Sequence, residues 1–154
     1  MGPGLGLGLG PMRSGAEDAG PPPPNMLANG EFSDGSGWTL APGSGGAAIA
    51  IASGQMVYTG ASSGGHATAT QTVSGLAAHA GQTLTLTVDL VANTASQRPS
   101  FSLGGATIFL PSATPGPYSM AVVVGGSNED LVVSAVLIEA ASRGYTIDNL
   151  TLTT

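Results

Sequence analysis

Residues 25–38 read NMLANGEFSDGSGW and residues 145–152 read YTIDNLTL. Between these stretches, short runs that alternate apolar and small polar residues are separated by Gly- and Ser-rich turns, such as residues 43–46 and 125–128. A period of two residues is typical of strands that bury one face. We therefore interpret the two stretches as the first and last strands of one closed β-sandwich.

The alternation is clearest in TLTLTVDL at residues 83–90, where Leu84, Leu86, Val88 and Leu90 share one face. No convincing helix is present in the sequence. The predicted fold class is all-β, a jelly-roll sandwich of two antiparallel sheets. We expect strands near Met26–Phe32, Ala47–Ala52, Gln55–Tyr58, Ala67–Val73, Thr83–Val91, Ser100–Leu103, Thr107–Leu110, Tyr118–Val124, Leu131–Ile138 and Tyr145–Leu152.

The composition limits the partners. At 154 residues the chain fits one domain, its net charge is −6, and its only cations are Arg13, Arg98 and Arg143. Because binding to nucleic acids and anionic membranes depends on Lys and Arg, neither partner is expected. No run of 18 or more apolar residues indicates a membrane span.

Residues 1–24 differ in composition from the rest, with seven Gly and six Pro. Such a segment packs no core, and it ends in the stiff run Pro21–Pro24. Leu5, Leu7 and Leu9 alternate with Gly, so they would share one face if the segment were laid on a neighbouring subunit as an extended strand. The alternatives are a disordered leader and an extended anchoring arm. We favour an arm at 1–24 that joins a jelly-roll domain at 25–154 to other subunits of a homo-oligomer.

Several motifs follow one another in a fixed order. They are Asn25, Asn29-Gly30, Phe32 and Gly37-Trp38, then Gln71-Thr72-Val73, AGQTLTL at residues 80–86 and YTIDNL at residues 145–150. The ordered set resembles the galactose-binding-like jelly-roll domains used as carbohydrate-binding modules, over nearly all of residues 25–154. Leu84 stands where the family usually has an aromatic residue. The resemblance implies the fold and leaves the ligand open.

A glycan site of this family would stack sugar rings on aromatic side chains, while amides and charged groups hold the hydroxyls. Three aromatics stand at motif positions that serve the core, namely Phe32, Trp38 and Tyr145. The remaining candidate platforms are Tyr58, Phe101, Phe109 and Tyr118. The alternative is that these strand aromatics belong to the core. If the chain has a glycan site, we expect it at Tyr58, Gln97, Arg98 and Tyr118.

The resemblance also implies a structural calcium, held by carboxylates near the first strand and by the closing Asp. The candidate ligands are Glu31, Asp34 and Asp148, although Ser33 stands where the family often has Glu. The alternative is that Asp148 bonds to turn amides while Glu31 and Asp34 sit in water. No other cofactor is expected.

No catalytic residue is predicted, and the chain is not expected to be an enzyme. GASSG at residues 60–64 fits a hydrolase motif, but that motif needs a following helix. His66 and His79 have no carboxylate in local reach and are interpreted as solvated.

The function expected from these features is a structural or adhesive subunit of a bacteriophage or phage-like particle, as a capsid decoration, head fibre or tail component. The arm would attach to other virion proteins, and the sandwich would face outward and bind host cell-surface polysaccharide. The expected location is the virion, assembled in the host cytoplasm, since the start of the chain lacks the pattern of a signal peptide. The alternative is a carbohydrate-binding module of a secreted bacterial glycan-degrading system, with residues 1–24 as a linker.

Overall fold

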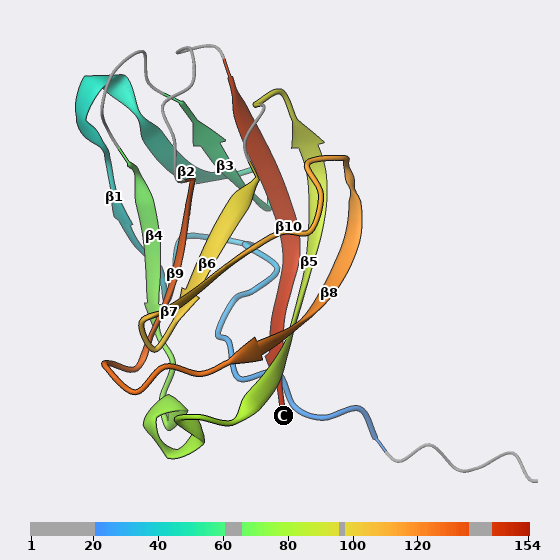
Figure 1. Cartoon of the computed structure of the whole chain (residues 1–154). Coiled ribbons are helices and arrows are strands. Elements are labelled where there is room, and N and C mark those ends of the chain that lie inside the picture. Colours follow the sequence, from blue (N-terminus) through green and yellow to red (C-terminus); the bar gives the residue numbers. More distant parts are fainter. Residues whose placement is uncertain (1–20, 61–65, 96–97, 136–142) are drawn as a thin grey trace, which may run out of the picture.

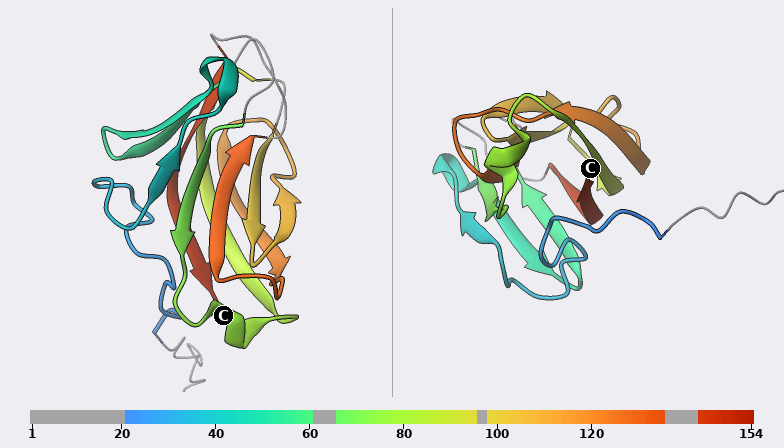
Figure 2. Two further views of the ribbon diagram at one scale, coloured as in Figure 1. Left: turned by 90° about the vertical axis from the view of Figure 1, so that its left-hand side faces the viewer. Right: turned by 90° about the horizontal axis from the view of Figure 1, so that it is seen from below.

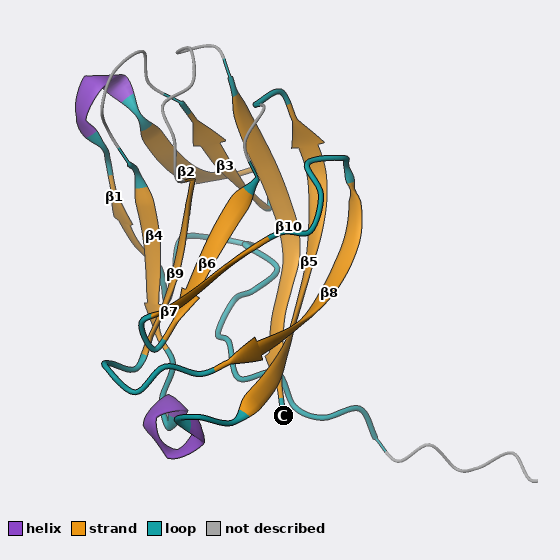
Figure 3. Cartoon of the chain, viewed as in Figure 1, coloured by secondary structure: helices purple, strands orange, loops and turns teal. Residues whose placement is uncertain are grey.

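The computed structural model describes residues 21–60, 66–95, 98–135 and 143–154. In this part of the chain, two five-stranded antiparallel sheets pack face to face (Figure 1). Helix is confined there to two short 3-10 turns, η1 (Ser44–Gly46) and η2 (Leu76–His79), which confirms the predicted all-β sandwich (Figure 3). No helix among the described residues is long and apolar enough to cross a membrane.

One sheet, here named sheet A, has the strand order β1-β4-β9-β6-β7. Figure 2 (left) shows β4, β9 and β6 of this sheet side by side. Its strands are β1 (Thr39–Ala41), β4 (Thr68–Thr72), β9 (Asp130–Ala135), β6 (Pro99–Leu103) and β7 (Ala106–Phe109).

The second sheet, sheet B, has the order β2-β3-β10-β5-β8, so the last strand lies in the middle of the sheet. Its strands are β2 (Ala48–Ala52), β3 (Gln55–Thr59), β10 (Gly144–Thr153), β5 (Thr83–Asn93) and β8 (Gly116–Val123).

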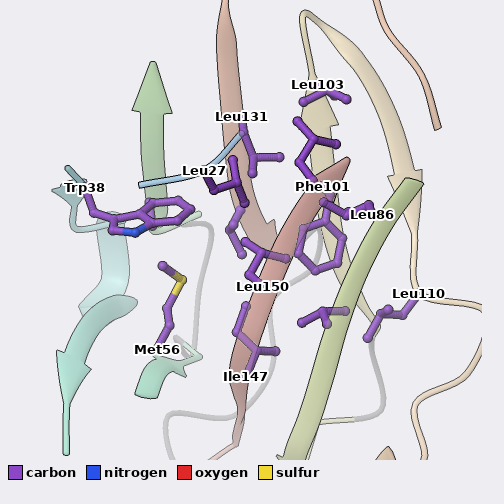
Figure 4. Close-up of a cluster of buried hydrophobic side chains, with 14 of the residues drawn as sticks. Leu27, Trp38, Met56, Leu86, Phe101, Leu103, Leu110, Leu131, Ile147 and Leu150 are labelled. Carbon is purple, nitrogen blue, oxygen red and sulfur yellow. The ribbon is translucent and has the colours of Figure 1, made fainter. Parts of the chain in front are cut away.

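The core lies between the two sheets and is built from the inward face of each strand. Figure 4 shows Phe101 and Leu103 of β6 together with Leu86 of β5 and Ile147 of β10. All four side chains are buried, and each such burial stabilises the fold by roughly 1.5–3 kcal/mol. The four apolar residues predicted on one face of residues 83–90 are likewise buried, which confirms that face as core.

The first predicted strand, Met26–Phe32, is wrong. Asn29 and Phe32 have φ angles of 50° and 51°, in the left-handed region that a strand does not use. The Asn29 side chain explains the turn, because its Oδ1 accepts a hydrogen bond from the Ser33 backbone N–H at 2.9 Å and so competes with strand pairing.

The two terminal motifs nevertheless lie side by side. The Met26 N–H donates to the Leu152 carbonyl at 2.8 Å, and the Leu150 N–H donates to the Gly30 carbonyl at 2.9 Å. The first motif therefore folds as a looped segment along β10, and the first strand among the described residues is β1.

The other nine predicted strands overlap observed ones, with ends that differ by a few residues. The end of the predicted strand Leu131–Ile138 lies outside the described residues, as do Gln97 and the arm residues Leu5, Leu7 and Leu9.

Candidate functional site

A shallow depression of about 300 Å³ crosses the outer face of sheet A. Most of its lining side chains carry hydroxyl groups. The lining residues are His66, Thr68, Ser100, Ser102, Thr107, Val132 and Ser134. The depression forms because the outward positions of the central strands β9 and β6 hold small side chains.

The strand register places these residues in two parallel rows across the sheet. In one row, Thr68 is paired with Ser134, Ser134 with Ser100, and Ser100 with Phe109. This row crosses four strands, a distance of roughly 14 Å at a strand spacing of about 4.8 Å. It therefore runs from a hydroxyl on β4 to an aromatic ring on β7.

The second row lies one pleat further along the strands. Val132 is paired with Ser102, and Ser102 with Thr107. Together the rows give a floor that mixes hydroxyl groups with the methyl groups of Thr and Val, and its accessible surface is largely apolar. Such a surface can contact both the hydroxyl groups and the C–H groups of a sugar.

Hydrogen bonds hold the floor in place. The Ser100 Oγ donates to the Ser134 carbonyl at 3.0 Å, and the Ser134 Oγ donates to the Ala67 carbonyl at 3.4 Å. Ser100 is buried at the bottom of the depression. The hydroxyls of Ser100 and Ser134 are thus oriented by the backbone of the sheet.

Phe109 closes one end of the row and is 43% exposed. The Arg98 guanidinium lies 6.0 Å from the centre of its ring, and the Arg98 Nη1 donates to the Pro111 carbonyl at 3.2 Å. A cation at this distance from the centre of a ring is attracted to the ring face. The chain therefore presents an oriented aromatic surface beside the hydroxyl rows.

Of the described residues that were predicted to bind a glycan, not all lie beside this exposed ring. Arg98 lies beside Phe109, but Tyr58 is 3% exposed and stacks on Tyr145 inside the sandwich, so the prediction of Tyr58 as an exposed platform is corrected. Tyr118 is half-buried on β8 of sheet B, where its hydroxyl donates to the Thr114 carbonyl. Arg98 and Tyr118 thus bond to carbonyls of the same loop, at Pro111 and Thr114.

Phe109 was one of four aromatic candidates in the sequence and was left out of the predicted site. The alternation in ATIF at residues 106–109 could have identified Phe109 as the exposed aromatic residue, because Ile108 packs against the core and Phe109 points the other way. His66, interpreted as a solvated residue, lines the depression. The two serines of β6 carried no signal of their own, because Ser is frequent throughout this chain.

The carboxylates predicted to bind calcium are engaged in different hydrogen bonds. The Asp34 Oδ1 accepts from the Asn29 Nδ2 at 2.9 Å and from the Ser36 N–H at 2.8 Å, and the bonds from Ser36 lower the pKa of Asp34. The Asp148 Oδ1 accepts from the Asn149 N–H at 2.7 Å.

Glu31 lines a separate polar depression of about 340 Å³ beside Asn29 and Ser33. Among the described residues, no three acidic, His or Cys side chains approach closely enough to hold a metal. The predicted calcium ligands are therefore not gathered into such a group.

A third depression, of about 220 Å³, lies along β3 and β10 of sheet B. Its lining includes the largely buried Tyr58 and Tyr145 besides Thr and small apolar residues, with Arg143 also part of it. We favour the depression on sheet A as the functional site because it combines ordered hydroxyl rows with an exposed aromatic ring.

Comparison with known proteins bears on the fold. No protein-family model matches the chain, and no curated protein matches it in sequence. Among solved structures, it is similar to the enzymatically active domain of tailspike protein 4 of bacteriophage CBA120, with a TM-score of 0.53 and 17% identity over 84% of this chain. This likeness shows the fold alone. The chain spans about a fifth, 21%, of that tailspike chain.

Carbohydrate-binding modules are also among the similar structures. A family 4 module has a TM-score of 0.49 and 16% identity, with 82% of this chain and 98% of the module covered. A family 11 module from Clostridium thermocellum, solved with a mixed-linked tetrasaccharide, has a TM-score of 0.47 and 14% identity, with 84% and 94% covered. The two antiparallel five-stranded sheets show that the jelly-roll sandwich predicted from the sequence motifs is the fold of this chain.

Proposed function

We propose that this protein is a non-catalytic glycan-binding protein whose sandwich binds a polysaccharide across the outer face of sheet A. The observation that carries the proposal is the row Thr68, Ser134, Ser100 and Phe109, in which oriented hydroxyls lead to an exposed ring. A sugar would stack on Phe109 while its neighbours along the glycan exchange hydrogen bonds with the two rows.

The electrostatics of the site agree with an uncharged or weakly acidic glycan. The chain is acidic overall, yet none of the described residues that line the depression is acidic. Glycosidic bond cleavage by the usual route needs two carboxyl groups flanking the bond. The described lining supplies neither of them, which supports binding without turnover.

The biological setting that we propose is a phage or phage-like particle, in which the arm anchors the subunit and the sandwich is displayed to the host. The similarity of the fold to a phage tailspike domain and the unusual composition of residues 1–24 support it. The second candidate is a carbohydrate-binding module of a secreted glycan-degrading system. The ordered motifs from Asn25 to Leu150 favour that candidate to a similar degree.

Binding can be tested on a broad glycan array, followed by titration calorimetry with the best ligand. Phe109→Ala should weaken binding about tenfold or more, whereas Phe109→Trp should retain it, because an aromatic ring is needed for stacking. Val123→Ala is the matched control, since Val123 is an exposed apolar residue, 54% accessible, on sheet B. Equal affinities of the Phe109→Ala and Val123→Ala proteins would remove the sheet A site from consideration.

A second variant tests the floor of the depression. Ser102→Leu should fill the space between β9 and β7 and reduce affinity, because Ser102 points outward between Val132 and Thr107. Thr85→Leu places the same side chain on the exposed face of sheet B and should leave binding unchanged.

The mass of the native species distinguishes the phage-particle setting from the secreted-module setting, since a particle subunit should be a symmetric oligomer and an isolated module a monomer.

A further inference from the structure

Strand β8 forms one edge of sheet B, and its outer side is open to pairing with another strand. β8 pairs with β5 over eight residues, from Gly116 opposite Leu90 to Val123 opposite Thr83, and no described strand pairs with its other side. Figure 1 shows β8 along one side of the sandwich. Such an edge offers a row of backbone N–H and C=O groups to another strand.

Proteins usually protect strand edges with charges, prolines or short length. The sequence of β8, GPYSMAVV, contains no charged residue, and its only proline is at its second position. The other edge strands of the described part are shorter, with three residues in β1, four in β7 and five in β2. β8 is therefore the edge best suited to accept a strand.

The side chains of β8 are apolar on the face that a new strand would extend. Tyr118 and Met120 are half-buried and pack against the core, and Val122 is buried next to them. On the other face, Ser119 and Ala121 are small and exposed. The same outward face also holds Pro117 and the exposed Val123. A strand that pairs with this edge should carry apolar residues that continue the row of Tyr118 and Met120, and it needs no large side chain beside Ser119 and Ala121.

The first residues of the chain have this pattern. Leu5, Leu7 and Leu9 are spaced by two, as are Tyr118, Met120 and Val122, and Gly occupies the positions between the leucines. We propose that residues 2–10 of one copy bind as an added strand along β8 of a second copy. The leucines would then continue the row of Tyr118 and Met120, and the glycines would lie beside Ser119 and Ala121.

The start of the described chain favours a second copy as the acceptor. Residues 21–24 are four exposed prolines, a stiff extended run that leaves the sandwich near the end of β10 (Figures 1 and 2). The ten residues 11–20 can add a reach on the order of 30 Å at about 3.3 Å per residue. The described run leads away from the sandwich, and ten further residues are long enough to span to the β8 edge of a neighbouring copy.

Association of the full chain tests the proposal. Light scattering and native mass spectrometry should show concentration-dependent oligomers, which Ala121→Lys should abolish by placing a charge on the β8 edge. Ala50→Lys places the same charge on the edge strand β2 and should leave the oligomers intact. Circular dichroism and thermal melting will show whether each variant remains folded.

Changes in the arm provide the second test, because they lie outside the sandwich. The triple variant Leu5→Ser, Leu7→Ser, Leu9→Ser should abolish oligomers as fully as Ala121→Lys. A monomeric wild-type protein, or oligomers that survive both sets of changes, would overturn the proposal.

A crosslink distinguishes the copies, since the chain has no cysteine of its own. Under oxidation, Gly6→Cys combined with Ala121→Cys should give disulfide-linked dimers and larger species, whereas Gly6→Cys combined with Ala50→Cys should not. A disulfide formed only within one chain would show that the arm covers its own edge, and would also overturn the proposal. Glycan binding plays no part in this test, so its outcome is independent of the proposed site on sheet A.

Discussion

Tyr58 and Tyr145 stack face to face between the two sheets, with ring centres 5.0 Å apart and ring planes inclined by 7°. They are cross-strand partners on β3 and β10. Both hydroxyl groups are buried without a hydrogen-bond partner in the described structure. The stacking is favourable, but the two unpaired hydroxyls carry a desolvation cost.

Removing one of these hydroxyls should stabilise the protein. We expect Tyr145→Phe to raise the free energy of unfolding by about 1 kcal/mol, because a buried polar group without a partner is replaced by an apolar one of the same shape. Urea denaturation measures the change. Tyr118→Phe is the matched control and should lower stability, since the Tyr118 hydroxyl donates to the Thr114 carbonyl. The opposite order of stabilities would show that the stacked hydroxyls are satisfied in solution.

The same pair should make the fold sensitive to alkali. Burial raises the pKa of both Tyr58 and Tyr145 above the ordinary value of 10.0. Above about pH 10 the tyrosines of the unfolded chain lose their protons more readily than those of the folded protein. The free energy of unfolding therefore keeps its full value below about pH 10 and falls as the pH rises above it. Melting temperatures should therefore fall between pH 9 and pH 11, in a range set by the tyrosine pKa of about 10. The melting temperature of the double variant Tyr58→Phe, Tyr145→Phe should fall less steeply over the same pH range.

The contact between the two terminal motifs depends on a glycine. A Cβ at Gly30 would lie 1.9 Å from the Leu150 carbonyl oxygen, which belongs to the backbone and cannot move without disturbing β10. We expect Gly30→Ala to lower the free energy of unfolding by about 2 kcal/mol or more through this clash. Gly35→Ala is the control, because a Cβ there meets nothing within 4 Å. Thermal melting of both variants checks the prediction, and equal melting temperatures would contradict it.

The sequence predicted most of this fold because the period of two is unbroken in the central strands. In residues 83–90 each Leu and Val is buried, as the alternation required. The pattern failed at Met26–Phe32, where apolar residues at Met26, Leu27 and Phe32 suggested a strand. The Asn29 side chain bonds to the following backbone there, and that local bond outweighs the weak strand pattern.

The candidate site was harder to predict, since it depends on which strands are neighbours. Thr68, Ser134, Ser100 and Phe109 are far apart in the sequence and meet only through the order β4-β9-β6-β7. The alternation of apolar and polar residues does not fix that order. The aromatic residues misled the prediction in a different way, because Tyr58 occupies an inward position of a short strand whose ends could not be placed to the residue.

Gln71 shows how a motif residue can serve the fold instead of the ligand. It is 3% exposed, and its side-chain amide makes two hydrogen bonds to the backbone of Ala28, donating to the carbonyl at 2.7 Å and accepting from the N–H at 2.9 Å. These bonds attach the looped first motif to β4 of sheet A. Gln71→Leu keeps a side chain of similar size but leaves both backbone groups of Ala28 without these partners. We expect the free energy of unfolding to fall by about 1–3 kcal/mol.

The comparison variant for Gln71→Leu is Gln82→Leu. Gln82 is exposed just before β5, and its side-chain bonds to His79 and to the Ala78 carbonyl lie at the surface, so this change should alter stability by less than about 0.5 kcal/mol. Hydrogen exchange adds a local measurement, because the loss of the Gln71 bonds should increase exchange at the Ala28 amide and at its neighbours in the first motif more than in the central strands. If glycan affinity fell with Gln71→Leu while stability and exchange were unchanged, Gln71 would act in recognition and its structural assignment would be wrong.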